Sequence, residues 1–463
     1  MMKNLFVCFI FFFLSIIAIA QEKIEITNIL IKGNKITKGD IILRELTFKK
    51  GDLLHPTMLE DKIQQSKQNL TNLMLFNFND ISTENNNGET NIIVEVVERW
   101  YIWPYPILEI SERNFNVWWD EFKESNYSDF SRMNFGAFLV WENFRGKNEL
   151  LKIKYRKGFK EHYLFSYEIP YFNKEKTIGF TVFAQQFRRK KSFYNTSENQ
   201  LLYYENDKQY SSKDFELKMD VLFRKDTRHK HKLKLHYLLS NIADSITLLN
   251  PNYLNNGQNN GSYYKVTYQY TNEQRDYITY PLKGHYLNLE LTKNFAGTSP
   301  VNHFEIRGKA EKHIEIQNRL FLGSSFLTKV TPDTFQPYFA QKGLGFEDYA
   351  RTYEYYVIDG QSFWLSKTAI KYELISKTNF ELPYLKMPQF KKSHYSLYFS
   401  VFTDLGYVID NQNTDNNNLT NILLFGRGCS LDYVTYYNKL LRIEFGINRL
   451  GEKGIFLHFT NPF

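Results

Sequence analysis

The sequence alternates between apolar and polar residues in segment after segment, and this pattern most constrains the fold. Between residues 214 and 223, one set of alternate positions is apolar: Phe215, Leu217, Met219, Val221 and Phe223. The positions between them carry charge: Asp214, Glu216, Lys218 and Asp220. Successive side chains of a strand point to opposite faces, so a period of two predicts β-strands with one apolar face. The same alternation recurs at 149–156, 285–293 and 440–448.

About sixteen strands can be placed after residue 100, and single-chain bacterial barrels have an even number. They are 100–110, 131–143, 148–157, 162–170, 177–189, 212–224, 231–243, 262–273, 284–295, 302–314, 317–330, 361–374, 395–405, 421–434, 438–448 and 454–463. We therefore predict a mainly β fold, a transmembrane antiparallel β-barrel of about sixteen strands. A soluble β-sandwich is the alternative, but it needs a second layer over the apolar faces. We expect no helix after residue 100 to supply one.

Composition supports the barrel. The chain holds 40 Phe and 33 Tyr, which suit the aromatic girdles of an outer-membrane barrel. Its mean hydropathy of −0.46 excludes a helical membrane protein. The net charge is +8, but the basic residues are spread along strands rather than clustered, which disfavours nucleic-acid binding. Attraction to anionic headgroups and a solvated surface remain as interpretations of this charge.

The N-terminus has the pattern of a targeting sequence. An apolar run over residues 5–20 follows Lys3 and ends in Ala-Ile-Ala. This predicts a secretory signal peptide over residues 1–20, with an uncleaved anchor as the alternative. Cleavage removes Cys8, so the mature chain keeps only Cys429. One cysteine excludes an intrachain disulfide and disfavours a structural zinc site.

The segment before the barrel predicts one small α+β domain. A strand over residues 24–32 ends at a Gly-Asn turn, and a short helix follows over residues 40–46. A longer helix begins at Pro56. Two strands, near 78–83 and 91–97, complete the order β-α-α-β-β.

This order and the stretches IKGNKITKGDIILREL and KKGD resemble a POTRA (polypeptide-transport-associated) domain. Three stretches of the predicted barrel resemble turns and strand ends of one family: NFRGKNE (143–149), EIPYF (168–172) and RDYITYPLKGHYL (275–287). The chain is thus similar to the bacterial surface-antigen family of outer-membrane assembly and translocation proteins, which includes the Bam and Tam barrels. The resemblance implies a POTRA domain over residues 22–98 and a barrel over residues 100–463.

The resemblance also implies a site inside the barrel. In the family, an external loop with a hydrophobic-Arg-Gly-aromatic motif folds into the lumen, where its arginine meets an acid on the thirteenth strand. Residues 350–353 read Ala-Arg-Thr-Tyr and match this motif except at Thr352, where the family has glycine. Alternation places two residues of strand thirteen, within FTDLG, on its lumen face. The expected loop lock, with an unpaired surface arginine as the alternative, consists of Arg351, Tyr353, Phe402 and Asp404.

The first and last strands of the barrel are expected to meet at a seam. Proline cannot donate to a ladder, and the first strand contains two prolines. A weakly bonded seam would suit a lateral gate at which a client strand is added. Ordinary fraying of the terminal strands is the alternative. The seam residues are Trp100, Pro104, Pro106, Phe459 and Phe463.

The resemblance implies a protein that inserts or translocates other polypeptides at the bacterial outer membrane. The periplasmic POTRA domain would receive unfolded clients or act only as a spacer, and the seam would template strand addition. The alternative function is a non-catalytic accessory or structural barrel subunit of an outer-membrane complex. The expected partners are outer-membrane lipid and lipopolysaccharide, unfolded outer-membrane or secreted polypeptides, and other assembly-complex subunits, with no nucleic acid.

Enzyme motifs are missing from the sequence. It contains no G-x-S-x-G, P-loop or H-E-x-x-H pattern. We therefore predict that the protein is not an enzyme and needs no cofactor or metal ion.

Overall fold

The computed structural model describes residues 23–86, 89–111, 119, 122–296, 303–332, 335–412, 416–437 and 439–460. The predicted signal peptide and Phe463 lie outside the described residues. The chain divides into two compact units, one ending at Glu98 and the other beginning at Arg99, with Ile36–Lys38 belonging to the second.

The N-terminal unit is a small mixed sheet with two helices. Its elements are β1 (Ile24–Lys32), α2 (Gly39–Glu45), β2 (Leu53–Leu54), α3 (Pro56–Asn72), β3 (Phe76–Asn86) and β4 (Glu89–Glu98). The strand order is β2-β1-β4-β3, with β1 and β4 parallel. Helix α3 begins with proline, whose fixed φ and missing N–H suit a first helical turn. It buries Leu59, Ile63 and Leu70, at helical spacing, against the sheet.

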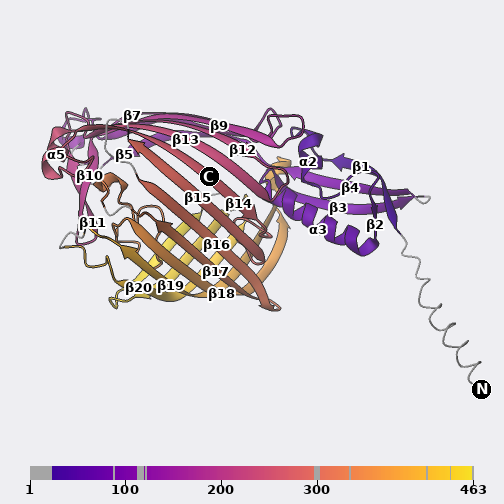
Figure 1. The fold of residues 1–463 in the computed structure, drawn as a ribbon. Coiled ribbons are helices and arrows are strands. Elements are labelled where there is room, and N and C mark those ends of the chain that lie inside the picture. The colour runs from indigo at the N-terminus through magenta and orange to yellow at the C-terminus, as the bar shows by residue number, and fades with distance from the viewer. Residues whose placement is uncertain are drawn as a thin grey trace, which may run out of the picture. The chain divides into compact units, whose positions relative to one another are not determined.

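The second unit is one antiparallel sheet of sixteen strands, as predicted (Figure 1). Its strands, in spatial order from the N-terminal edge, are β5 (Ile102–Ile110), β6 (Met133–Phe144), β7 (Glu149–Gly158), β8 (Lys160–Ile169), β9 (Ile178–Arg189), β12 (Ser212–Phe223), β13 (His229–Ile242), β14 (Asn260–Glu273), β15 (Gly284–Ala296), β16 (Phe304–Gln317), β17 (Leu320–Val330), β18 (Ser362–Glu381), β19 (Lys392–Ile409), β20 (Leu423–Thr435), β21 (Lys439–Asn448) and β22 (Lys453–Thr460).

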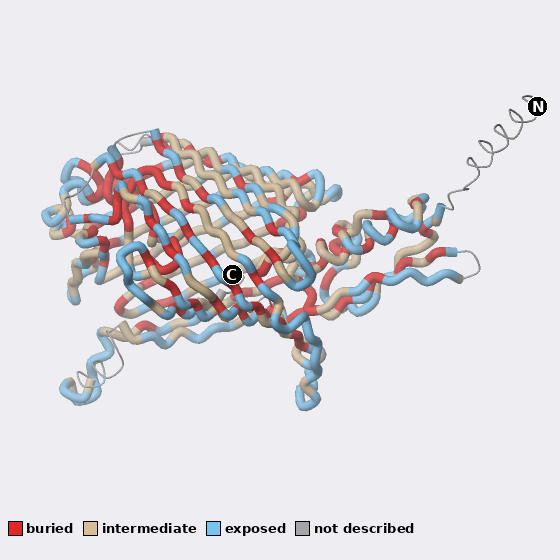
Figure 2. Tube along the Cα trace, turned by 90° about the horizontal axis from the view of Figure 1, so that it is seen from below, coloured by how far each residue is buried: buried red, intermediate tan, exposed pale blue. Residues whose placement is uncertain are grey.

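Alternation along these strands separates an outer from an inner face. On β19, Phe399, Val401 and Leu405 are exposed, whereas Phe402 and Asp404 are buried. Figure 2 shows buried and exposed residues alternating along the strands of the large sheet. The apolar set faces outward on β19, as the sequence predicts, because the polar set is enclosed by the sheet.

Short elements decorate the connections, and the expectation of no helix after residue 100 was wrong. A hairpin of β10 (Lys191–Ser197) and β11 (Gln200–Glu205) lies between β9 and β12, and helices α5 (Asp244–Leu249) and α6 (Pro388–Lys391) lie in other connections. These helices have six and four residues, too few to produce a helical period in the sequence. None of the helices described is long and apolar enough to cross a membrane.

Candidate functional site inside the barrel

The connection between β17 and β18 folds into the lumen and carries the predicted arginine. We call residues 344–361 the inward loop. Leu344 and Ile358 pair across it, with the Ile358 N–H donating to the Leu344 carbonyl over 2.8 Å. The loop contributes four residues to one buried cluster with inward side chains of β17–β20: Leu344, Ala350, Tyr353 and Ile358. Burial of this apolar surface holds the loop against the inner wall.

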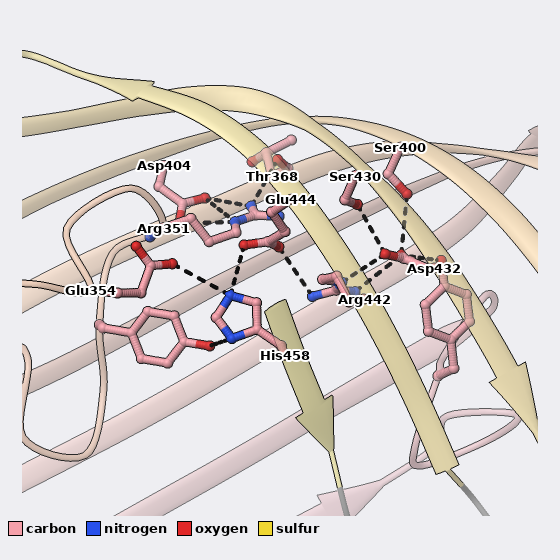
Figure 3. A network of polar contacts seen from close by, with 12 residues as sticks. Arg351, Glu354, Thr368, Ser400, Asp404, Ser430, Asp432, Arg442, Glu444 and His458 are labelled. Carbon is pink, nitrogen blue, oxygen red and sulfur yellow. Dashed lines mark hydrogen bonds and ion pairs between the residues drawn. The ribbon is translucent and has the colours of Figure 1, made fainter. Parts of the chain in front are cut away.

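Arg351 and Asp404 form a buried ion pair at the tip of the inward loop (Figure 3). The Arg351 Nε donates to both Asp404 oxygens over 3.0 and 3.1 Å, and Nη2 also donates to Oδ1. The backbone N–H of Arg351 donates to Oδ2 over 2.9 Å. Asp404 is fully buried and Arg351 is 7% exposed. One carboxylate therefore holds both the guanidinium and the main chain, which sets the orientation of the loop tip.

Phe402 and Thr368 complete the surroundings of the guanidinium. The Arg351 Cζ lies 4.0 Å from the centre of the Phe402 ring, a cation–π geometry. Its Nη2 donates to the Thr368 carbonyl over 3.3 Å. Because these partners lie on β18 and β19, the loop tip is bonded to two adjacent strands.

Tyr353 anchors the loop through its hydroxyl, at a second place on the wall. Its hydroxyl donates to the Phe425 carbonyl and accepts the N–H groups of Phe425 and Arg449, each over 3.2 Å. It thereby connects the loop to β20 and to the turn after β21. The four predicted lock residues are all buried, but they make two anchors, one on β18–β19 and one on β20–β21.

The loop tip is strained at Thr352, where the resembled family has glycine. Thr352 has φ +77°, a left-handed conformation that a β-branched residue rarely adopts. The tip lies against two glycines of the wall. A Cβ on Gly426 would meet the Arg351 carbonyl at 2.4 Å, and one on Gly446 would meet Thr352 Cγ2 at 2.3 Å. The role of these glycines could not be predicted from the sequence, since it depends on a neighbour distant in the chain.

A second segment enters the lumen from the other end of the barrel. Residues 274–283 connect β14 to β15. Because connections alternate between the two ends of an antiparallel sheet, this one lies at the end opposite to the β17–β18 connection. The Tyr280 hydroxyl donates to Asp432 Oδ2 over 2.7 Å, and Arg442 Nε donates to Oδ1 over 2.8 Å. Burial and the Asp432 charge raise the pKa of Tyr280 well above its usual value, so the phenol remains a donor. A cavity of about 300 Å³ has both Tyr280 and Arg351 in its lining.

The expected seam lacks a backbone ladder in the described part of the chain. The sheet runs from β22 to β5, and no pairing joins these two strands among the described residues. Pro104 and Pro106 lie on β5 opposite Leu139 and Ala137 of β6. Since the pairing with β6 is continuous, the proline nitrogens face the other edge.

Side chains nevertheless reach across near the start of β5. Trp100 precedes β5, and its backbone N–H donates to the Tyr437 hydroxyl over 2.9 Å. The ring of Trp103 meets Tyr437 edge-on at 5.6 Å. Tyr437 lies in the connection between β20 and β21, so this end of the first strand is held by an aromatic contact. At the opposite edge, Phe459 of β22 is exposed.

Family models match both units of the chain. A model described as the Omp85 superfamily domain matches residues 143–448. A POTRA model, described as a surface antigen variable number repeat, matches residues 24–99. These matches confirm the family resemblance inferred from the sequence. No match was found among curated proteins.

The chain is also similar to three solved structures. BamA from Haemophilus ducreyi lacking POTRA domains 1-3 is 13% identical, with a TM-score of 0.47 over 94% of this chain and 84% of that one. CdiB from Acinetobacter baumannii is 13% identical, with a TM-score of 0.47 over 94% and 73%. CdiB from Escherichia coli is 11% identical, with a TM-score of 0.50 over 94% and 75%. At 11% identity, the likeness to this third structure concerns the fold alone.

The buried ion pair can be tested by a double-mutant cycle. We expect Arg351→Ala and Asp404→Ala each to lower the free energy of unfolding by about 3–5 kcal/mol, because each leaves an unpaired buried charge. The double variant should lose less than the sum of the two. Urea unfolding of the refolded barrel gives the energies, with Arg319→Ala in the β16–β17 turn as control. Additive losses would contradict direct coupling.

The strain at Thr352 predicts an order of stability between two variants. Both Thr352→Gly and Thr352→Ala remove the buried hydroxyl, but only glycine adopts the left-handed conformation freely. We expect the glycine variant to be more stable than the alanine variant by about 1 kcal/mol. Thermal unfolding of both proteins under one condition measures the difference, and equal stability would show that the tip is unstrained.

Asp359 at the end of the inward loop predicts a pH dependence. Burial raises its pKa to about 7, the Thr196 hydrogen bond partly offsets this, and the Asp410 charge adds to it. The folded pKa lies above the unfolded value of 3.8, so the folded state binds the proton more tightly between these values. The stability contributed by this group is therefore present at low pH and is lost as pH rises through about 7.

Asp359→Asn removes this ionisation. We expect the melting temperature of the variant, relative to the unmodified protein, to rise between pH 5 and pH 8. Exposed Asp244 on α5 provides the control, since Asp244→Asn should show a smaller change. A constant difference between Asp359→Asn and the unmodified protein would rule out the buried acid as the cause.

Proposed function

The chain belongs to the Omp85 superfamily, and from this premise we propose that its barrel adds client strands at the free edge of β5. Membership implies insertion of proteins into the outer membrane or their translocation across it, by an outer-membrane barrel with a periplasmic POTRA domain. Members of the superfamily are insertases and transporters rather than enzymes.

The observation that carries this proposal is that β5 and β22 each have a neighbouring strand on one side only among the described residues. Leu108 on β5 is 75% exposed, and Leu457 on β22 is 69% exposed. Leu233 on β13, with a strand on each side, is 39% exposed. In hydrocarbon an unpaired strand edge is costly, so such an edge favours pairing with an incoming strand.

The two prolines of β5 make its edge poor in donors. With their nitrogens directed away from β6, Pro104 and Pro106 each remove an N–H from the free edge. Closure by β22 is weakened there, while the carbonyl groups of β5 remain available to a client. The aromatic contact of Trp103 with Tyr437 holds the beginning of β5 without using these backbone groups.

The inward loop supports the same function by stiffening the opposite side of the seam. Its anchors lie on β18–β21, next to the terminal strand β22. The edge can thus exchange partners while the adjacent wall keeps its shape. Outer-membrane lipid and lipopolysaccharide contact the apolar outer face.

The POTRA domain provides a second sheet edge for clients. β3 is the outer strand of its sheet, with β4 on one side only. An extended, unfolded polypeptide adds to such an edge through main-chain hydrogen bonds, which accept many sequences. In this proposal β3 receives outer-membrane or secreted polypeptides before they reach the barrel.

Site-specific photocross-linking in cells tests the edge. A benzoylphenylalanine at Leu108 or Leu457 is expected to cross-link to newly made outer-membrane polypeptides. The same group at Leu233, in the middle of the wall, is the matched control and should give none. Equal yields at the edges and at Leu233 would contradict strand addition at the seam.

Depletion of the protein separates this function from that of an accessory subunit. Loss of many barrel proteins from the outer-membrane proteome is expected for an insertion role. Loss of one partner alone would assign the chain to an accessory or structural role in a single complex. Re-expression of the protein with benzoylphenylalanine at Leu233 controls for indirect effects of depletion and should restore the outer-membrane proteome.

A further inference from the structure

We propose that Glu354, Glu444 and His458 form a binding site for a divalent transition-metal ion such as Zn²⁺. The three residues come from three elements: Glu354 from the inward loop, Glu444 from β21 and His458 from β22 (Figure 3). A bound ion would tie the loop to the terminal strand of the sheet. The sequence did not reveal this site, since the residues share no metal-binding spacing.

The ligand atoms have the separations that a small coordination sphere needs. His458 Nε2 lies 3.1 Å from Glu444 Oε2 and 3.5 Å from Glu354 Oε1. All three ligand atoms lie within 4.8 Å of one another. Zinc bonds of about 2.0–2.1 Å in a tetrahedron place neighbouring ligands roughly 3.3 Å apart. The observed separations lie on both sides of this value.

Unsatisfied carboxylate oxygens point to a cation. Both oxygens of Glu354 and Oε1 of Glu444 are buried without a hydrogen-bond partner among the described residues. The Glu444 side chain is 1% exposed, and that of Glu354 is 15% exposed. Arg442 approaches Glu444 Oε1 only to 3.7 Å. Two enclosed carboxylates with so few donors favour a divalent ion between them.

Tyr349 orients the imidazole for coordination. Its hydroxyl lies 3.4 Å from His458 Nδ1, and the two rings stack at 5.7 Å. With Nδ1–H donating to this oxygen, the lone pair of Nε2 points toward the carboxylates. An outer partner of this kind commonly fixes the tautomer of a metal-binding histidine.

The ligand set selects the class of ion. One imidazole and two carboxylates suit Zn²⁺, and Co²⁺ serves as its spectroscopic substitute, whereas Ca²⁺ and Mg²⁺ prefer oxygen ligands alone. A water molecule would take the fourth position. Coordination requires neutral His458, so a proton and a metal ion compete for Nε2.

Metal titration of the purified chain tests the site. The protein is prepared in detergent without a polyhistidine tag, freed of metal with a chelator, and titrated with Zn²⁺ by calorimetry and with Co²⁺ by visible absorption at pH 7.5. We expect one ion per chain and a higher melting temperature with Zn²⁺. Glu354→Gln and His458→Ala should each weaken binding at least about tenfold and abolish the thermal shift.

His313→Ala is the matched control. His313 lies 3.3 Å from Glu311 in the same lumen, but Arg275 and Lys309 already neutralise that carboxylate. Its removal should leave metal binding unchanged. Absence of Co²⁺ absorption in the unmodified protein would overturn the site and leave a protonated His458 bridging two carboxylates. Equal affinity in His458→Ala would overturn it too, even if Glu354→Gln does not fold.

Discussion

Every backbone amide inside a membrane must find its hydrogen-bond partner within the protein, and the architecture of this chain depends on that constraint. A sheet satisfies it everywhere except at its first and last strands. Here the sixteen-stranded sheet has β5 and β22 at those positions, and prolines reduce the donors on one of them. The unpaired strand edges, which cost the most free energy in lipid, are thus also the places where another strand can form backbone hydrogen bonds.

Two buried aspartates in the lumen are bound in the same way. Asp404 on β19 and Asp432 on β20 are both fully buried, and each carboxylate binds an arginine together with a group from an inserted segment. A buried carboxylate without such donors would be strongly destabilising. The inserted segments and the wall therefore depend on each other, since each supplies what the other needs.

Alternation made the wall readable from the sequence, including the inward position of Asp404 on β19. It could not predict which residues meet across the lumen, because a period of two reports the face of a strand and not the curvature of the sheet. Gly426 and Gly446 leave room for Thr352, yet no residue near them in sequence indicates that the tip of the inward loop packs there. Tyr280 reaches Asp432 over 152 positions. Short elements such as α5 were missed because they contain too few residues to show a period.

The distribution of the anchors has a mechanical consequence. The inward loop is bonded to β18–β21, and the 274–283 segment is bonded to β18 through Lys371 and to β20 through Asp432. Both segments are also bonded outside these strands: the Val357 N–H of the inward loop donates to the Asn199 carbonyl in the β10–β11 turn over 2.8 Å, and Arg275 donates to Glu311 on β16 over 2.8 Å. The two segments therefore link the inner wall from β16 to β21 and connect it to the β10–β11 hairpin. If β5 moves relative to β22, we expect the displacement to be largest in the strands next to β5 that neither segment contacts.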